Sequence, residues 1–143
     1  MSKNHHHPTI FQSILGELPT GQERYHFLIY IDIDACLACT EDMAAWIELE
    51  KNLPQCGCSF SLWAPASDSF DVAYAMELEG LRSPVRVVDR SIVREVERRR
   101  LQTPIKVLLD SLARPINIKG AVGNREESRR YAEHILSDVC REN

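Results

Sequence analysis

The sequence lacks any apolar run long enough to cross a membrane, and its first residues, Met-Ser-Lys-Asn-His-His-His-Pro, lack the apolar core of a secretion signal. Basic residues are not in excess either, because 17 Lys and Arg face 21 Asp and Glu, which gives a net charge of -4. Nucleic-acid binding normally leaves a basic patch, so we expect no nucleic-acid partner. We expect a protein without a membrane span that is cytoplasmic, or periplasmic only if a leader has been removed.

Cysteine is limited to five residues at uneven spacing. An odd number without a secretion signal argues against the disulfide framework of a small secreted domain. It favours a catalytic or metal-binding pair among otherwise free thiols. At 143 residues and 44% apolar content, the chain can build one packed core.

The N-terminal part of the chain separates from this core as a tail and a short helix. The three histidines at residues 5–7 lie in a polar stretch typical of a disordered end, and we assign them no role. Apolar residues recur at helical spacing over residues 10–18, which predicts a short amphipathic helix. We therefore divide the chain into a tail with this helix, residues 1–24, and one folded domain, residues 25–143.

The most informative stretch is residues 27–39, Phe-Leu-Ile-Tyr-Ile-Asp-Ile-Asp-Ala-Cys-Leu-Ala-Cys. Its β-branched and aromatic start predicts a buried strand over residues 27–33, and a helical pattern follows over about residues 37–52. Cys36 and Cys39, spaced C-x-x-C, would therefore lie where a helix begins. Unpaired N–H groups and the helix dipole stabilise a thiolate on Cys36 there, and Cys39 would follow about one turn later. This arrangement is typical of thiol-disulfide exchange.

The remaining chain alternates strand and helix patterns. Further strands are expected from apolar or alternating runs, and the last two are close enough in sequence to form an antiparallel hairpin. The expected strands cover residues 59–64, 84–89, 104–110 and 115–119, and helices are expected to begin after caps at Asp68 or Ser69, at Ser91 and at Asn124. This order predicts an α/β fold with a central mixed sheet flanked by helices.

A strand ending in C-x-x-C, alternating strand and helix units, and Thr103-Pro104 ahead of a hairpin resemble the thioredoxin superfamily. The resemblance covers residues 25–140. An additional strand and helix within residues 82–100, before the Thr-Pro pair, is similar to the redoxin branch, the TlpA-like and ResA-like thiol-disulfide oxidoreductases. The resemblance implies a thioredoxin-like fold with an inserted βα unit before the strand that follows a cis-proline.

The same resemblance implies roles for four residues. Cys36 would attack a protein or small-molecule disulfide, and Cys39 would resolve the mixed disulfide. Pro104 would be cis and lie against the cysteine pair, while Thr103 would offer backbone groups to the substrate. No cofactor and no metal is implied, because the electrons reside on the two sulfurs. A reductase or oxidant partner would reset the pair.

The sequence departs from the family at several positions near the cysteines. Ala35 replaces the usual aromatic residue before the first cysteine, and Leu37-Ala38 lacks the proline common between the two. Tyr30 stands where thioredoxin has a buried acid, so that role is vacant or passes to Asp32 or Asp34. These departures keep open a second class of function, a non-catalytic thioredoxin-like interaction or redox-sensor module in which the cysteines pack as small hydrophobic residues.

A second pair of cysteines, Cys56 and Cys58, raises a zinc site as an alternative. A helix of about 16 residues between the two pairs would hold its ends roughly 24 Å apart, far beyond one tetrahedral site. We therefore expect Cys56 and Cys58 to be an exposed loop pair, with a second redox or metal-responsive site as the alternative. Cys140 is expected to be an ordinary helix cysteine.

Overall fold

The computed structural model describes residues 23–38, 40–112, 114–120 and 124–140, and for residues 36–38 and 40 it describes the backbone alone. The expected short helix within residues 10–18, and almost all of the expected tail, lie outside the described residues.

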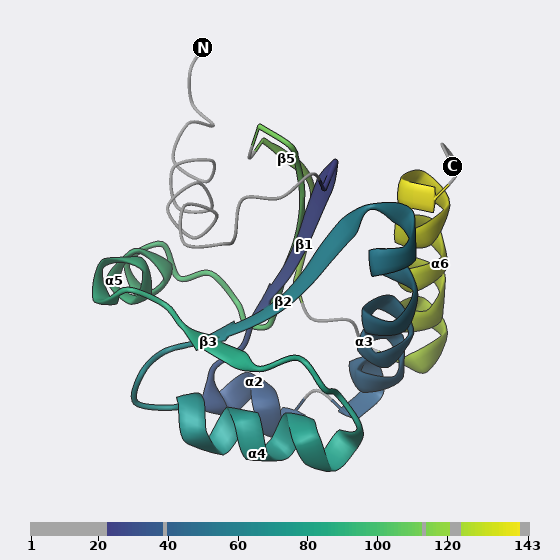
Figure 1. The fold of residues 1–143 in the computed structure, drawn as a ribbon. Coiled ribbons are helices and arrows are strands. Elements are labelled where there is room, and N and C mark those ends of the chain that lie inside the picture. Colours follow the sequence, from purple (N-terminus) through teal and green to yellow (C-terminus); the bar gives the residue numbers. More distant parts are fainter. Residues whose placement is uncertain (1–22, 39, 113, 121–123, 141–143) are drawn as a thin grey trace.

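A five-stranded mixed sheet forms the centre of the protein (Figure 1). The strand order is β3-β2-β1-β4-β5, with parallel pairing on the β3 side of β1 and antiparallel pairing on the β5 side. The bounds are β1 (Tyr25–Tyr30), β2 (Cys58–Ala64), β3 (Val85–Val87), β4 (Ile105–Asp110) and β5 (Pro115–Lys119). The expected hairpin is confirmed, because β4 and β5 pair antiparallel.

Helices flank this sheet on both faces (Figure 1). Their bounds are α2 (Ile33–Ala38), α3 (Thr40–Asn52), the 3-10 helix η1 (Leu53–Cys56), α4 (Ser69–Glu79), α5 (Arg90–Arg98) and α6 (Arg125–Cys140). The α3 and α6 helices pack against each other over one face, and α5 covers the other. The expected α/β fold with a central mixed sheet flanked by helices is confirmed. No described helix is long and apolar enough to cross a membrane.

The alternation of side chains along β1 produces the two halves of the core. Phe27 and Ile29 pack in the cluster that includes residues of α3 and α6, whereas Leu28 packs in the cluster that includes residues of α5. Both tryptophans are buried, Trp46 in the first cluster and Trp63 in the second. The strand reads as a continuous apolar run because both of its faces are covered.

The start of the first helix differs from the expectation. The strand ends at Tyr30 and the helix α2 begins at Ile33, several residues earlier than the sequence pattern predicts. Asp32 explains the difference, because its Oδ1 atom accepts the N–H of Ala35 at 2.9 Å and so caps the helix. The expected cap of the C-terminal helix, α6, is confirmed, because Oδ1 of Asn124 accepts the N–H of Glu127 at 2.9 Å.

The expected states of three cysteines are wrong. Cys56 and Cys140 form a disulfide, because the end of η1 packs against the end of α6. Cys58 is the first residue of β2, where it pairs with Tyr25 and is completely buried. Cys56 and Cys58 are therefore not an exposed loop pair, and Cys140 is not an ordinary helix cysteine.

Candidate functional site

The pairing of β1 with β4 brings two of the expected site segments to one end of the sheet. Tyr30, the last residue of β1, pairs with Ile105, the first residue of β4. Thr103-Pro104 therefore lies beside the chain that leaves β1 and enters α2. The peptide bond between Thr103 and Pro104 is cis, and Pro104 is buried while Thr103 is partly exposed.

A hydrogen bond links these two segments directly. The hydroxyl of Thr103 donates to Oδ1 of Asp32 at 2.9 Å, and the same oxygen accepts the N–H of Ala35. Asp32 is half-buried, whereas Asp34, the other acid considered, is exposed. Of the two acids, Asp32 is thus the one that contacts the Thr-Pro segment.

A second carboxylate holds the start of α2. Oδ2 of Asp68 accepts the N–H of Ile33, the first residue of α2, at 2.9 Å. Carboxylates at a helix N-terminus satisfy N–H groups that have no partner within the helix and interact favourably with the dipole. The N–H groups of Ile33 and Ala35 are therefore occupied by the protein's own carboxylates, not free to bind a thiolate as the sequence pattern suggested.

The structure describes the two predicted redox cysteines only in part. Cys36 is the fourth residue of α2, so the helix that carries it starts beside Thr103. Its side chain, and Cys39 as a whole, lie outside the described residues. The structure thus positions Thr103, Pro104 and the backbone of Cys36 at one end of the sheet.

Tyr30, which the resemblance aligns with the buried acid of thioredoxin, is a buried phenol. Tyr30 is 3% exposed, and burial, together with the nearby charge of Asp32, raises the pKa of its hydroxyl above the usual range. A neutral phenol at this position carries no charge near the start of α2. Tyr30 therefore does not supply the acid that the resemblance leads us to expect at this position.

A buried ionic cluster joins β4, α3 and α6, and sequence reasoning missed it. Nζ of Lys106, in β4, contacts Oδ2 of Asp42, in the first turn of α3, and both side chains are almost fully buried. The hydroxyl of Ser128 donates to the other oxygen of Asp42, and Nζ of Lys106 lies 4.8 Å from the centre of the Tyr131 ring. One signal was available, because Lys106 interrupts an otherwise apolar run within the strand expected over residues 104–110.

No group of three or more metal-ligating side chains comes together among the residues that the structure describes. Cys58 is two residues from the disulfide, and burial raises the pKa of its thiol to about 12, so it carries no thiolate at neutral pH. The alternative of a metal-responsive Cys56 and Cys58 pair is thus not favoured.

No family model matches this sequence, and no curated protein matches it. Solved structures do match the fold. The thioredoxin domain of a thiol-disulfide oxidoreductase from Bacteroides vulgatus has 11% identity and a TM-score of 0.60, with 80% of this chain and 81% of that chain covered. A thiol:disulfide interchange protein from Bacteroides sp. has 11% identity and a TM-score of 0.62, covering 82% and 74%. A putative thiol:disulfide interchange protein DsbE from Chlorobium tepidum has 9% identity and a TM-score of 0.63, covering 82% of each chain. The protein therefore has a thioredoxin-like fold.

Proposed function

We propose that the protein is a thiol-disulfide oxidoreductase that works through Cys36 and Cys39. The Cys36 thiolate attacks one sulfur of a substrate disulfide, which forms a mixed disulfide and releases the other sulfur as a thiolate. Cys39 then attacks Cys36, which releases the second substrate sulfur and leaves a Cys36–Cys39 disulfide. Two electrons pass to the substrate, and a reductase restores the dithiol. In the reverse direction an oxidant partner restores the disulfide.

The observation that carries this proposal is the hydrogen bond between Thr103 and Asp32. It ties the cis Thr103-Pro104 segment to the cap of the helix that contains Cys36. An extended substrate segment lying along Thr103 would be held beside that helix, which is the positioning that a bimolecular exchange reaction requires. The solved structures with this fold that carry thiol-disulfide names support the same reaction class.

The disulfide also changes the compartment that we propose. Disulfides persist in oxidising compartments and are rare in the cytoplasm, where thiols are kept reduced. The Cys56–Cys140 bond therefore favours a periplasmic or other oxidising location over the cytoplasmic one that the N-terminal sequence suggested.

A second function remains, a non-catalytic interaction or redox-sensor module with this fold. It is favoured by the two carboxylates at the start of α2, because Asp32 and Asp68 occupy N–H groups that would otherwise stabilise a thiolate. In this alternative the cysteine pair would not turn over a substrate.

The deciding experiment measures reduction of oxidised glutathione and of a disulfide-containing peptide by the wild type, Cys36→Ser, Cys39→Ser and the control Cys58→Ala. We expect Cys36→Ser to lose activity by about 100-fold or more, because the thiolate is the nucleophile. We expect Cys39→Ser to accumulate a mixed disulfide with substrate, and Cys58→Ala to stay active. Full activity of Cys36→Ser would end the proposed mechanism.

A redox-buffer titration with mass-spectrometric peptide mapping separates the two candidate functions. A reversible Cys36–Cys39 disulfide, assigned separately from Cys56–Cys140, is expected for an oxidoreductase. A pair that never oxidises at any accessible potential would favour the interaction module.

A further inference from the structure

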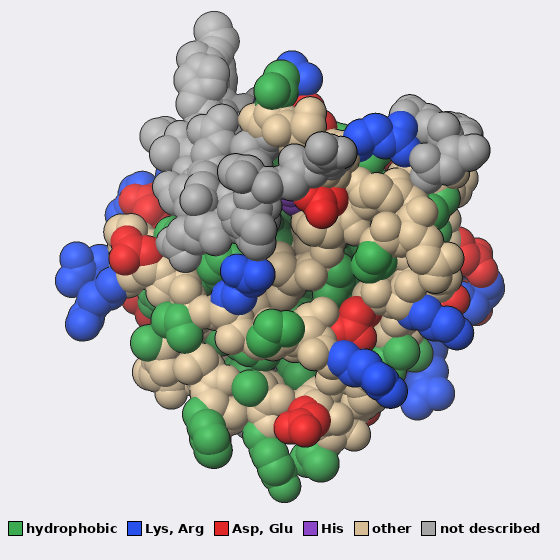
Figure 2. Space-filling view, viewed as in Figure 1, with side chains coloured by type: hydrophobic (Ala, Val, Ile, Leu, Met, Phe, Trp, Pro, Cys, Tyr) green, Lys and Arg blue, Asp and Glu red, His purple; other side chains and the backbone are tan. Residues whose placement is uncertain are grey.

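The exposed face of α4 carries a stripe of large apolar side chains. Phe70, Tyr74 and Leu78 are spaced four residues apart, so they lie on one side of the helix, and they are 82%, 61% and 68% exposed. The opposite side, with Val72 and Met76, is buried in the core. Figure 2 shows hydrophobic side chains projecting from the molecule over α4, at the bottom of the view. Large apolar side chains exposed in a row on one helix face point to a site of interaction.

The charged side chains of α4 itself all have one sign. Asp71, Glu77 and Glu79 are exposed on the same helix, which contains no Lys or Arg. A partner that covers the stripe must therefore bring its own basic groups beside apolar ones, since unpaired like charges at an interface oppose binding.

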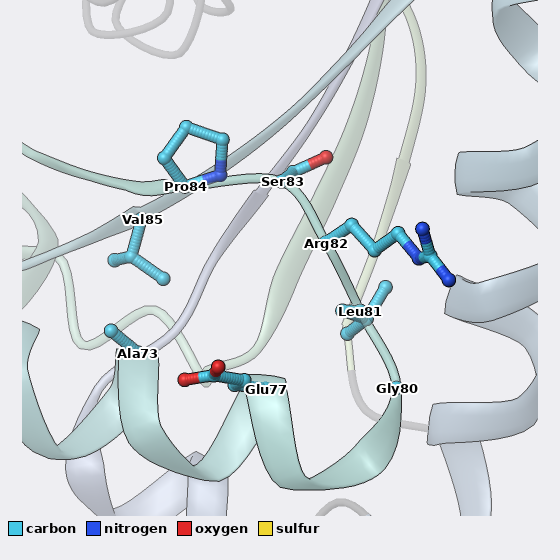
Figure 3. Close-up of a pocket in the computed structure, with 8 residues that line it drawn as sticks. All are labelled: Ala73, Glu77, Gly80, Leu81, Arg82, Ser83, Pro84 and Val85. Carbon is cyan, nitrogen blue, oxygen red and sulfur yellow. The ribbon is translucent and has the colours of Figure 1, made fainter.

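A pocket of about 590 Å³ extends the surface on one side of the stripe. Ala73 and Glu77 form its α4 wall, and the chain from Leu81 to Val85 forms the opposite wall (Figure 3). Arg82 also lines the pocket, but its side chain points away from Glu77, toward α3, and so does not face Glu77 across it (Figure 3). The acidic wall of the pocket and the apolar stripe share one helix, so they can contact the same partner.

Glu50, in α3, fixes the pocket wall that lies opposite α4. Oε2 of Glu50 accepts the N–H groups of Arg82 and Ser83 at 2.9 and 2.6 Å. The pocket is therefore a preformed hollow between fixed elements, which lowers the ordering cost of binding.

The stripe starts close to the helix of Cys36. Asp68, the N-cap of α4, accepts the N–H of Ile33 at the start of α2, and the two helices contact each other. Phe70 is two residues beyond this link. A macromolecule that reaches Cys36 can therefore lie along the stripe at the same time.

We infer that the α4 surface, made of Phe70, Tyr74, Leu78 and the adjacent pocket with Glu77, docks the disulfide-bearing protein partner through a segment of mixed apolar and basic side chains. The inference rests on the proposed oxidoreductase function and specifies the partner's chemistry. If α4 packed against α4 of a second chain, the acidic rim of Asp71, Glu77 and Glu79 would face its own copy, which opposes such a dimer. An anionic membrane surface is repelled for the same reason.

The test compares three disulfides. The first is a synthetic peptide whose disulfide is flanked by Leu, Phe and Lys, the second has Glu in place of each Lys, and the third is oxidised glutathione. The triple variant Phe70→Ser, Tyr74→Ser, Leu78→Ser removes the stripe, and Asp71→Lys with Glu77→Lys reverses the rim. Leu112→Ser is the matched control, because Leu112 is 66% exposed in the turn that follows β4, at the far end of the sheet from α2.

We expect kcat/KM for the basic peptide to fall about tenfold or more in the stripe and rim variants, through KM, and to stay unchanged in Leu112→Ser. The rim variant should gain turnover of the Glu peptide. Turnover of oxidised glutathione should be the same in all four proteins, because so small a substrate does not reach α4. Unchanged kcat/KM for the basic peptide in the stripe variant, or equal turnover of both peptides by the wild type, would overturn the inference.

A binding measurement tests the docking surface independently of the redox chemistry. Peptides with both cysteines replaced by serine are titrated by fluorescence anisotropy, and the stripe variant should bind the Lys peptide about tenfold more weakly than the wild type. If no disulfide is turned over but this difference holds, the proposed function fails while the docking surface stands. A wild-type dimer that the stripe variant abolishes, or stripe-dependent binding to phosphatidylglycerol vesicles, would instead show a different occupant and contradict the inference.

Discussion

Thr103 and Asp32 are joined by a 2.9 Å hydrogen bond between the Thr103 hydroxyl and Oδ1 of Asp32. The same oxygen caps α2 through the N–H of Ala35. One carboxylate atom therefore determines both where the helix of Cys36 begins and where the segment before Pro104 lies. Both the stability of the protein and its exchange activity should therefore depend on Asp32.

Replacing Asp32 by Ala should lower the free energy of unfolding by about 1–2 kcal/mol, because the helix loses its cap and Thr103 loses its acceptor. The measurement is urea denaturation followed by circular dichroism. Asp34→Ala is the control, since Asp34 lies in the same helix but is exposed, and it should change stability little. A cycle with Thr103→Val should show a coupling of about 1 kcal/mol, and additive effects would contradict the shared contact.

The buried pair of Asp42 and Lys106 gives a second prediction. Lys106→Met alone should cost about 3–5 kcal/mol in the free energy of unfolding, because it leaves the carboxylate of Asp42 buried without its cation. The double variant Asp42→Leu, Lys106→Met should recover part of this loss, since it removes both charges. Urea denaturation measures all three proteins. A single variant within about 1 kcal/mol of the wild type would show that the pair is not buried as described.

The strands β1 and β4 could be predicted from sequence because their apolar runs are buried on both faces. The run that contains β1 and that of β4 each read as a strand without any knowledge of the fold. The end of β1 was placed too late because Ile31 and Ile33 continue the pattern of apolar residues. The strand ends earlier because Asp32 caps the helix that follows. A cap depends on a single side chain, whereas the apolar pattern extends over many residues, so the pattern hides the cap.

Contacts between distant residues could not be predicted in the same way. Cys56 and Cys140 are 84 residues apart, and nothing in their spacing indicates that η1 and α6 pack together. Sequence alone places Asp42 among the acids near a helix start but does not reveal its partner, because Lys106 lies on a strand that reaches α3 only in the folded protein. The order of elements follows from local patterns, whereas the partners of buried polar groups follow from the tertiary structure.

A pH dependence of stability is expected from His26. The residue is buried in β1, with Nδ1 lying 2.8 Å from Oγ of Ser59, and burial lowers the pKa of the imidazole below its usual value of 6.5. The unfolded chain then binds a proton more readily than the folded protein. The free energy of unfolding should therefore fall as the pH drops below about 6.5, and His26 should contribute no pH dependence well above it.

The measurement is the urea midpoint at several pH values between about 8 and 5, a range in which carboxylates remain mostly ionised. His26→Asn, which keeps a polar atom near Ser59, should flatten the decrease below pH 6.5. His134→Asn is the control, because His134 is exposed on α6. An equal slope in the wild type and His26→Asn would contradict the assignment.

The Cys56–Cys140 disulfide should contribute about 4 kcal/mol to stability, because it closes a long loop in the unfolded chain. Cys56→Ser with Cys140→Ser, or reduction of the wild type, should therefore lower the free energy of unfolding by a similar amount, which urea denaturation detects as a lower midpoint. Under the same reductant the double serine variant should show no further change. A wild-type midpoint that does not respond to reduction, with peptide mapping showing no linked pair, would refute the bond.

Cys58 is a free thiol two residues from Cys56 of the disulfide. Burial raises the pKa of Cys58 to about 12, so its thiolate is almost absent at neutral pH and its sulfur is shielded from solvent. In the folded protein at about pH 8, iodoacetamide should leave Cys58 unmodified, and in denaturant it should modify Cys58 fully. Mass-spectrometric mapping resolves each cysteine, so rapid labelling of Cys36 in the same sample would show that the two thiols differ in environment. Labelling of Cys58 at the rate of a small free thiol would contradict its burial at the start of β2.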